Sequence, residues 1–234
     1  MIEINKIYLG DCLEIMKLID DNSIDLIIID PPYGINYNYG FNKKAIKSKI
    51  NNDSSIENLD WVKIIDSSYR ILKENKSFYI HGRFDSLVKI FNIIKNKFKY
   101  NQDFVWDKGD MNSGNLNIMG NIHELILHFS KENPEKSRLQ LNENIKIKKR
   151  VKAYFKGKLS TKEYVGHPTQ KPIKLLEYII QNRTDENDLI LDYFCGSGTT
   201  GVACQNLNRR FLLCDNDKTW INIAKNRLKL NDDN

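Results

Sequence analysis

Apolar runs and helical periodicities alternate along most of the chain. Short runs rich in β-branched and aromatic residues predict strands, which we place at Ile4–Leu9, Ile24–Ile29, Ser77–His81, Asp103–Asp107, Glu124–Phe129, Leu189–Leu191 and Phe211–Cys214. Apolar residues at helical spacing predict amphipathic helices, which we place at Leu13–Ile19, Leu59–Leu72, Arg83–Lys97, Ile173–Gln181, Gly201–Leu207 and Trp220–Leu230. This alternation predicts an α/β fold with a mostly parallel sheet and helices on both of its faces.

Two long stretches show neither period. Residues Ile35–Ile56 are rich in Asn, Lys and Tyr, and Asn133–Gly166 is strongly basic with Tyr154 and Phe155 interleaved. Long connections of this kind are usually functional or disordered. We expect the first to be a mobile loop and the second to be a small inserted recognition segment, both belonging to one domain that spans residues 1–234.

Composition limits the class of protein. A hydrophobic content of 41% with 28% charged residues is ordinary for a soluble globular chain. No apolar run is long enough to cross a bilayer and the N-terminus does not look like a secretory signal, so we expect a cytoplasmic protein without membrane contact. Neither CxxC nor metal-ligand spacing occurs among the cysteines, so we expect reduced, apolar thiols and no metal site; they are Cys12, Cys195, Cys204 and Cys214.

The net charge of +6 is concentrated in two places. Residues Lys136–Lys162 hold ten Lys or Arg and one acid, and Gly40–Lys49 hold four Lys and no acid. Such runs are often plain solvated surface, but excess charge confined to two stretches also suits a phosphate backbone. The candidate nucleic-acid contacts are Lys43, Lys44, Lys47, Lys148, Lys149, Arg150 and Lys152.

The strand Ile24–Ile29 ends abruptly at Asp30-Pro31-Pro32-Tyr33. Ligands of open α/β sheets bind at the carboxyl ends of the strands, and two prolines restrict the local backbone. A carboxylate and a rigid carbonyl can each accept one hydrogen of an exocyclic amino group, while the Tyr33 ring can stack on the base that carries it. An ordinary strand-ending turn is the alternative interpretation.

A second strand end carries a glycine turn. Gly196, Gly198 and Gly201 form GxGxxG after a strand and at the start of a helix, and Asp215 follows Gly196 by nineteen residues at the next strand end. Glycines allow the backbone to approach a ligand closely, and an acid at that place can bind two ribose hydroxyls. The turn predicts a nucleoside cofactor, with NAD as the competing candidate because it uses the same fingerprint.

Chain length decides how the sheet must be completed. Only 33 residues follow Gly201, too few for the rest of a conventional dinucleotide domain. We therefore expect a Rossmann-like sheet with a circularly permuted motif order, in which the catalytic half comes first and the cofactor half last. Asp30 and Gly196 should then line one crevice.

Together the motifs resemble a known family. Asp30–Tyr33, a basic variable segment, His167–Pro172 and Phe194–Thr200 are similar to the amino-methyltransferases of DNA in the order called the beta class. The resemblance covers nearly the whole chain except Ile35–Ile56 and Asn133–Gly166. It implies S-adenosylmethionine as the cofactor and, because the first motif begins with Asp and not with Ser, the N6 amine of adenine as the methyl acceptor. Tyr193 stands where this family usually has Pro.

The resemblance also implies roles for individual residues. The residues that would hold and stack the base are Asp30, Pro31, Pro32 and Tyr33. Those implied to bind the cofactor are Asp11, Cys12, Asp30, His167, Pro168, Thr169, Gln170, Lys171, Asp192, Phe194, Cys195, Gly196, Ser197, Gly198, Thr199 and Asp215. Among them Asp11 and Cys12 are implied for the cofactor's adenine, although an Asp at such a turn is more commonly a helix N-cap.

The expected activity is methyl transfer to a base flipped out of double-stranded DNA. Methylation of cytosine C5 uses a Cys after a Pro, a pair that this sequence does not contain. Methylation of cytosine N4 or of an RNA base stays an alternative, and so does a DNA-binding subunit with a vestigial pocket. Self-association into a homodimer and a cognate restriction endonuclease are further expectations about partners.

Overall fold

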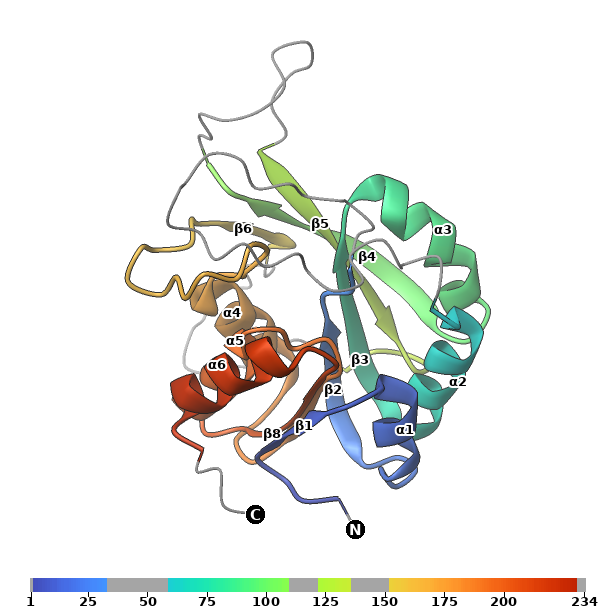
Figure 1. Ribbon diagram of the computed structural model, residues 1–234. Helices are drawn as coiled ribbons and strands as arrows, with labels where there is room; N and C mark the ends of the chain where they lie inside the picture. Colours follow the sequence, from blue (N-terminus) through green and yellow to red (C-terminus); the bar gives the residue numbers. More distant parts are fainter. Residues whose placement is uncertain (1, 33–58, 110–121, 136–151, 231–234) are drawn as a thin grey trace.

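The computed structural model describes residues 2–32, 59–109, 122–135 and 152–230, and within these residues the strands form one eight-stranded sheet (Figure 1). In chain order they are β1 (Lys6–Leu9), β2 (Ile24–Ile29), β3 (Leu72–Gly82), β4 (Lys99–Asp107), β5 (His123–Ser130), β6 (Tyr154–Lys156), β7 (Leu189–Asp192) and β8 (Arg210–Asp215). Their order across the sheet is β1-β8-β7-β2-β3-β5-β4-β6.

Strand β2 lies where the two halves of the sheet meet. It pairs in parallel with β7 on one side and with β3 on the other. Strands β1, β8 and β7 are also parallel, whereas β5 runs antiparallel between β3 and β4. The late strand β7 thus sits beside the early strand β2, as the permuted order predicted.

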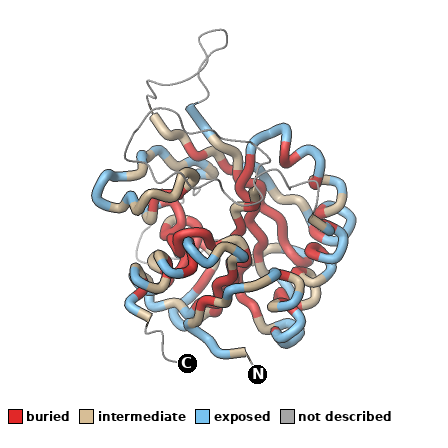
Figure 2. The backbone as a smooth tube through the Cα atoms, in the orientation of Figure 1, coloured by how far each residue is buried: buried red, intermediate tan, exposed pale blue. Residues whose placement is uncertain are grey.

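Helices cover both faces of the sheet (Figure 1). They are α1 (Cys12–Lys17), α2 (Trp61–Ile71), α3 (Phe84–Lys95), α4 (Ile173–Arg183), α5 (Thr199–Asn206) and α6 (Lys218–Leu228). One apolar core joins the sheet to α1, α2 and α3, and a second joins its opposite face to α4, α5 and α6. Buried backbone accordingly follows the central strands in Figure 2. In the described residues no helix is long and apolar enough to cross a membrane.

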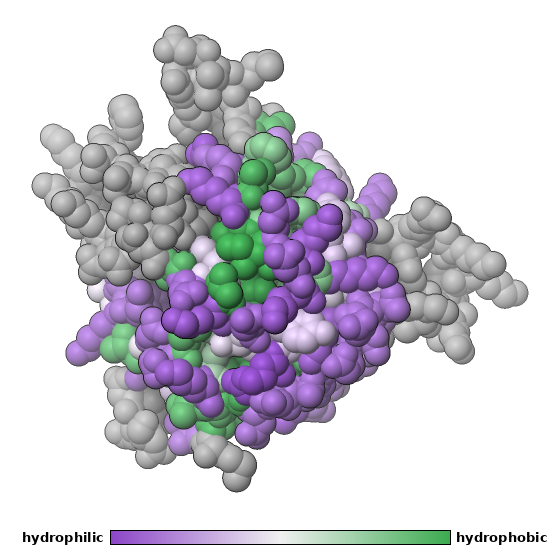
Figure 3. Space-filling view, turned by 90° about the vertical axis from the view of Figure 1, so that its right-hand side faces the viewer, coloured by the Kyte–Doolittle hydropathy of each residue, from purple (hydrophilic) through white to green (hydrophobic). Residues whose placement is uncertain are grey.

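The outer surface over α2 and α3 is mostly hydrophilic, with a small apolar group among the polar side chains (Figure 3). The exposed apolar side chains of these helices are Val62, Phe84 and Val88. Both helices are amphipathic, since Ile64 and Ile65 of α2 are buried beneath this surface. Burial of one face and hydration of the other explains why their periodicity was visible in the sequence.

Asp25 is the one polar residue in β2 and is 3% exposed. Its carboxylate accepts a hydrogen bond from the Leu189 backbone N–H at 3.0 Å and forms an ion pair with Lys73 at 2.8 Å. A buried carboxylate is tolerated only when its oxygens have such partners. Because Leu189 opens β7, Asp25 joins the beginnings of β2 and β7.

Several element boundaries differ from the sequence prediction. The first strand begins at Lys6 and not at Ile4, because Asn5 has a left-handed φ of 61°. The last helix begins at Lys218 behind an Asp217 N-cap and ends at Leu228, where Lys229 adopts φ 53°. Strand β6 was not predicted, since it is only three residues long and lies at the sheet edge. The expected loop Ile35–Ile56 lies outside the described residues, as does most of the basic part of Asn133–Gly166.

The cysteine prediction is confirmed. All four cysteines are free and buried. Burial raises the pKa of Cys12 to about 12, so its thiol stays protonated and behaves as an apolar group.

Candidate active site

A cleft opens at the carboxyl ends of the central parallel strands. The empty space in it, together with the open solvent at its mouth, amounts to about 1040 Å³. Its walls come from sequence segments more than 100 residues apart, because Asp30 follows β2 and Gly196 follows β7. The predicted convergence of Asp30 and Gly196 in one crevice is therefore present.

The glycine turn owes its shape to two left-handed residues. Gly196 has φ 47°, and a Cβ there would lie 2.8 Å from His167 Nε2. Gly198, the N-cap of α5, has φ 76°, and a Cβ there would lie 2.8 Å from the Ala224 Cβ on α6. L side chains rarely adopt such φ values, and both positions are crowded. Glycine is required here by backbone conformation and by close packing together.

The buried Asp192 and the partly buried Asp215 secure this turn. Asp192 accepts hydrogen bonds from the Phe194 N–H and the Thr200 hydroxyl. Asp215 accepts the Gly196 N–H at 2.8 Å. Burial raises the pKa of Asp192 to about 7 and also raises that of Asp215. The turn thus presents its backbone at an acidic wall of the cleft.

A clamp from α6 completes the turn. The Arg227 guanidinium donates to the Ser197 carbonyl at 2.7 Å and to the Thr199 hydroxyl at 3.1 Å. The sequence analysis did not identify this residue, because a basic residue near the end of a helix normally faces solvent or the helix dipole. Arg227 ties the last helix to the turn that the cleft uses.

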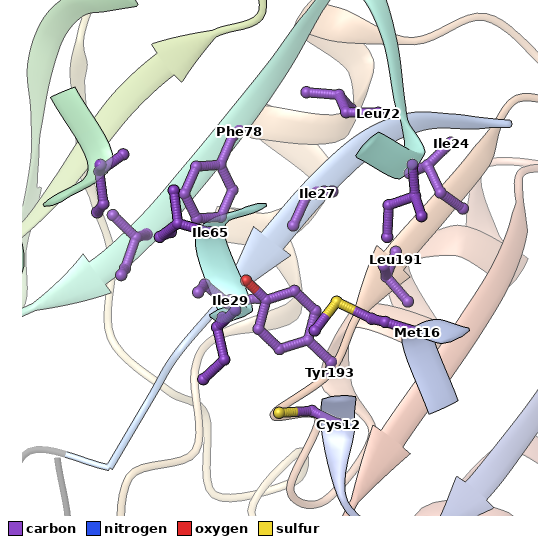
Figure 4. Packing of buried hydrophobic residues seen from close by; sticks show 14 of the residues in the cluster. Cys12, Met16, Ile24, Ile27, Ile29, Ile65, Leu72, Phe78, Leu191 and Tyr193 are labelled. Atoms are coloured by element: carbon purple, nitrogen blue, oxygen red, sulfur yellow. The ribbon is translucent and has the colours of Figure 1, made fainter. Parts of the chain in front are cut away.

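Tyr193 is accommodated within the core and not in the cleft. Figure 4 shows its ring lying near Ile29, Met16 and Cys12. The side chain is 1% exposed, and its hydroxyl lies 3.0 Å from the Ser68 Oγ of α2. A buried hydroxyl with a partner costs little. The departure from proline therefore leaves the neighbouring turn intact.

Opposite the glycine turn, four charged groups alternate in sign. Lys171 Nζ lies 2.6 Å from Asp30 Oδ2 and 3.3 Å from Glu124 Oε2, and Glu124 also pairs with Lys108. Lys171 donates in addition to the Thr169 carbonyl at 3.3 Å. The Lys171 side chain is 5% exposed, so its hydrogen bonds to Asp30 and Thr169 and its ion pair with Glu124 replace the water that burial removes.

The pKa values reflect this pairing. Burial alone would lower the pKa of Lys171, but the Asp30 and Glu124 carboxylates raise it above the ordinary value. Burial alone would raise the pKa of Glu124, but Lys171 and Lys108 bring it down to about 2. Lys171 therefore stays an ammonium and Glu124 a carboxylate across the physiological pH range.

Most of the predicted site residues line the cleft. They are Asp30, Pro31, Pro32, His167, Thr169, Gln170, Lys171, Asp192, Phe194, Cys195, Gly196, Ser197, Thr199 and Asp215. Of the other described candidates, Pro168 and Gly198 belong to the same two segments but are not among the lining residues. Asp11 caps α1 through the Leu13 N–H, and Cys12 is packed in the core. A cofactor contact by either of these last two stays a prediction.

Of the remaining candidates only Lys152 is described, and it is not among the lining residues. Lys152 is exposed, and its carbonyl accepts a hydrogen bond from the Tyr178 hydroxyl. Outside the described residues are Tyr33, Lys43, Lys44, Lys47, Lys148, Lys149 and Arg150.

The cleft also contains residues that the sequence analysis missed. His81 and Trp220 line it, and Glu124 forms an ion pair with Lys171. No motif marks these residues. His81 and Glu124 lie in ordinary strand patterns, and only the sheet order brings the end of β3 and the beginning of β5 next to Asp30.

Comparisons with known proteins agree with this arrangement. Residues 24–226 match the sequence model of a family described as DNA methylase. The chain is 32% identical to the Type II methyltransferase M2.LlaDCHI of Lactococcus lactis subsp. cremoris, over 94% of this chain and 87% of that protein. It is 27% identical to the DNA adenine methyltransferase YhdJ of Escherichia coli K12, over 94% of this chain and 81% of that protein. The solved structure of an M1.HpyAVI–SAM complex superposes with a TM-score of 0.74 at 27% identity, covering 96% of this chain and 99% of that one.

The glycine turn yields a stability prediction. Gly198→Ala should lower the free energy of unfolding by about 2–4 kcal/mol, because it adds left-handed strain and a collision with Ala224. Gly166→Ala is the matched control, since Gly166 has φ 94° with nothing within 4 Å of a Cβ, and should cost only the strain, about 1–2 kcal/mol. Urea unfolding measures both variants. Equal losses would mean that the approach of α6 to the turn is unimportant.

Proposed function

The chain belongs to the DNA methylase family, and from this premise we propose that it transfers a methyl group from S-adenosylmethionine to the N6 amine of adenine in double-stranded DNA. Membership confirms the family resemblance drawn from the motifs. The observation that carries the proposal is the shared cleft, in which the early acidic motif faces the late glycine turn. The adenine target is supported by the name of YhdJ and the cofactor by the M1.HpyAVI–SAM complex.

The glycine side of the cleft fits a nucleoside cofactor. The turn exposes backbone at Gly196, and the Asp215 carboxylate lies beside it, where it can accept ribose hydroxyls. The buried Trp220 Nε1 has no partner among the described residues and lines the same space. Bound there, S-adenosylmethionine would supply an electrophilic methyl group. Phe194, Gly196 and Thr199 are the residues we assign to its methionine part.

The Asp30 side would hold the acceptor. An adenine amine is a poor nucleophile because its lone pair is delocalised into the ring. The Asp30 carboxylate and the Pro31 carbonyl can accept its two hydrogens, which draws the nitrogen toward tetrahedral geometry and localises the lone pair for attack. Asp30 acts here as a hydrogen-bond acceptor, since the amine proton becomes acidic only after the methyl group has been transferred.

Lys171 would keep Asp30 in this state. Its ammonium holds one carboxylate oxygen at 2.6 Å and is itself supported by Glu124 and Thr169. This contact restricts the orientation of the carboxylate at the wall of the cleft. Lys171 was expected to contact the cofactor. The ion pair supports instead a role in positioning the group that binds the base.

DNA binding is assigned to the basic stretches. A base must leave the duplex to reach a cleft of this kind, at a cost of a few kcal/mol that phosphate contacts offset. We assign target recognition to residues 133–166, and a gripping loop to residues 35–56, within a single domain. Self-association and a cognate restriction endonuclease also stay predictions, the second supported by the Type II name of M2.LlaDCHI.

The proposed activity can be tested in cells and with the purified protein. DNA from cells that express the chain should contain N6-methyladenine at one sequence context, detected by modified-base sequencing and by digestion to nucleosides. Asp30→Ala should abolish the modification, because the amine loses its acceptor, and leave S-adenosylmethionine affinity within about two-fold, because Lys171 keeps Glu124 as a counter-ion and the glycine turn is unchanged. Asp66→Ala, which alters an acid on α2 paired with Lys97, is the control and should behave as the parent does. Equal single-turnover rates for Asp30→Ala and the parent would refute the role of Asp30.

The second prediction concerns Lys171. Lys171→Met should lower kcat about 100-fold, since two partly buried carboxylates lose their common cation and Asp30 loses its orientation. The KM for S-adenosylmethionine should change little. Lys174→Met removes an exposed lysine three residues later, which pairs with Glu177, and should have no effect on turnover. A rise in the cofactor KM with kcat unchanged would instead place Lys171 at the cofactor.

The third prediction addresses DNA affinity. Changing Lys148, Lys149 and Arg150 to Glu should weaken binding at all sequences and make the dependence of log K on log salt shallower by about 0.9 for each phosphate that the protein no longer neutralises. The matched control reverses three exposed lysines outside the basic segment: Lys17, Lys95 and Lys97. A salt slope equal to that of the parent would remove the basic segment from the interface.

A further inference from the structure

His81 is a buried imidazole without a partner at the wall of the cleft. It lies near the end of β3, and the pairing of Ile29 with Ile80 places it next to Asp30. The side chain is 1% exposed and lines the cleft. Neither ring nitrogen has a hydrogen-bond partner among the residues that the structure describes. Buried polar atoms without partners are rare in native proteins and mark places where a ligand or water completes the bonding.

A second buried histidine in the same sheet behaves differently. His128 of β5 stacks on Tyr79 with ring centroids 4.4 Å apart, and its Nε2 lies 3.0 Å from the Ser77 Oγ. His128 is as deeply buried as His81 but has a structural partner for one nitrogen. His128 Nδ1 also has no partner among the described residues, so the two histidines differ in that one nitrogen of His128 is paired and neither nitrogen of His81 is.

The environment keeps His81 uncharged. Burial lowers its pKa to about 4, although the nearby carboxylates of Asp30 and Glu124 oppose this shift. Lys171, which faces the same space, lowers the pKa further. A neutral imidazole has one N–H donor and one acceptor nitrogen. His81 therefore brings a neutral donor to the wall beside Asp30.

Beside the acceptors Asp30 and Pro31, His81 places a donor that has no partner among the described residues. The nitrogen N1 of adenine, next to the carbon that bears the amine, is an acceptor and cannot bond to Asp30 or to the Pro31 carbonyl. The Lys171 ammonium already donates to Asp30 and to the Thr169 carbonyl and forms an ion pair with Glu124. The Trp220 indole of α6 packs against the His167 ring, with the two ring centroids 4.3 Å apart.

We propose that His81 reads the target base by donating a hydrogen bond to the ring nitrogen N1 beside the reacting amine. This inference rests on the proposed function and adds a specificity-determining residue to it. Together with Asp30 and Pro31, His81 would match the donor and acceptor pattern of the adenine Watson–Crick edge. A base with a keto group and a protonated N1 presents the reverse pattern and would be rejected.

The test uses a duplex in which 1-deazaadenine replaces the target adenine, so that N1 becomes C–H while the amine is kept. In single-turnover experiments the parent protein should methylate this duplex about 10-fold to 100-fold more slowly than the duplex with adenine. His81→Phe should lose about the same factor on adenine and should lose little more on 1-deazaadenine. The analogue also alters the reactivity of the amine, but it does so equally for both proteins. The adenine-to-1-deazaadenine rate ratio of the parent, divided by that of His81→Phe, therefore isolates the contact between His81 and N1. A duplex with 7-deazaadenine, which keeps N1, should not distinguish the variant from the parent in this way.

Two further variants guard against a structural explanation. His81→Gln retains a side-chain N–H donor and should recover part of the preference for adenine over 1-deazaadenine. His128→Phe replaces the comparable buried histidine away from the cleft and should keep the full preference. S-adenosylmethionine affinity within about two-fold of the parent shows that His81→Phe is folded.

The outcomes separate the two proposals. If the parent methylates adenine and 1-deazaadenine equally, or if His81→Phe keeps the parent's preference, His81 does not read N1 and the inference is overturned while the proposed function stands. If the parent transfers no methyl group to adenine in DNA, the proposed function fails and the inference falls with it. If His81→Phe loses the preference for adenine over 1-deazaadenine and His128→Phe keeps it, the contact between His81 and N1 is supported.

Discussion

The parallel pairing of β2 with β7 is the contact on which the site depends. It joins the first third of the chain to the last fifth and sets the ends of both strands at one edge, Asp30 beside the glycine turn. Asp25 supports this pairing from the opposite end, where its buried carboxylate accepts the Leu189 N–H. A slip of one residue would turn every side chain of β2 to the other face and bury Asp30 in the wrong core. The polar residue that interrupts the apolar run of β2 thus helps to specify where the site forms.

The second constraint is electrostatic. Burying one charge is costly, but Lys108, Glu124, Lys171 and Asp30 are arranged with alternating sign, so each charge has an opposite neighbour. Removing Lys171 would take from Asp30 its cationic partner, and removing Glu124 would take from Lys108 its anionic one. Such a network is weak evidence for stability, since apolar residues could replace it at little cost. Its position at the wall of the cleft explains it better, because it holds one carboxylate in a fixed orientation toward the ligand.

Local patterns predicted the main elements well and the site partly. The β2 run and the glycine turn after β7 are short-range signals, so their strands, their ends and the acids that follow were located correctly. The clamp by Arg227, the support by Glu124 and the imidazole of His81 left no such signal. Each of them acts across elements that are distant in sequence, and a basic, acidic or aromatic residue in an ordinary strand or helix usually has no such role. Lys171 shows the same limit, because its motif was recognised while its partners were not.

The sequence by itself determined the fold class, the permuted order of the two halves and the two motifs that carry the chemistry, because period, turn residues and chain length are all local or countable properties. Tertiary structure decided which charges meet, which buried nitrogens lack partners and which glycine has to accommodate a neighbouring helix. These depend on the order of strands across the sheet. That order arises from packing between segments that the chain itself does not place side by side, and so no window of sequence contains it.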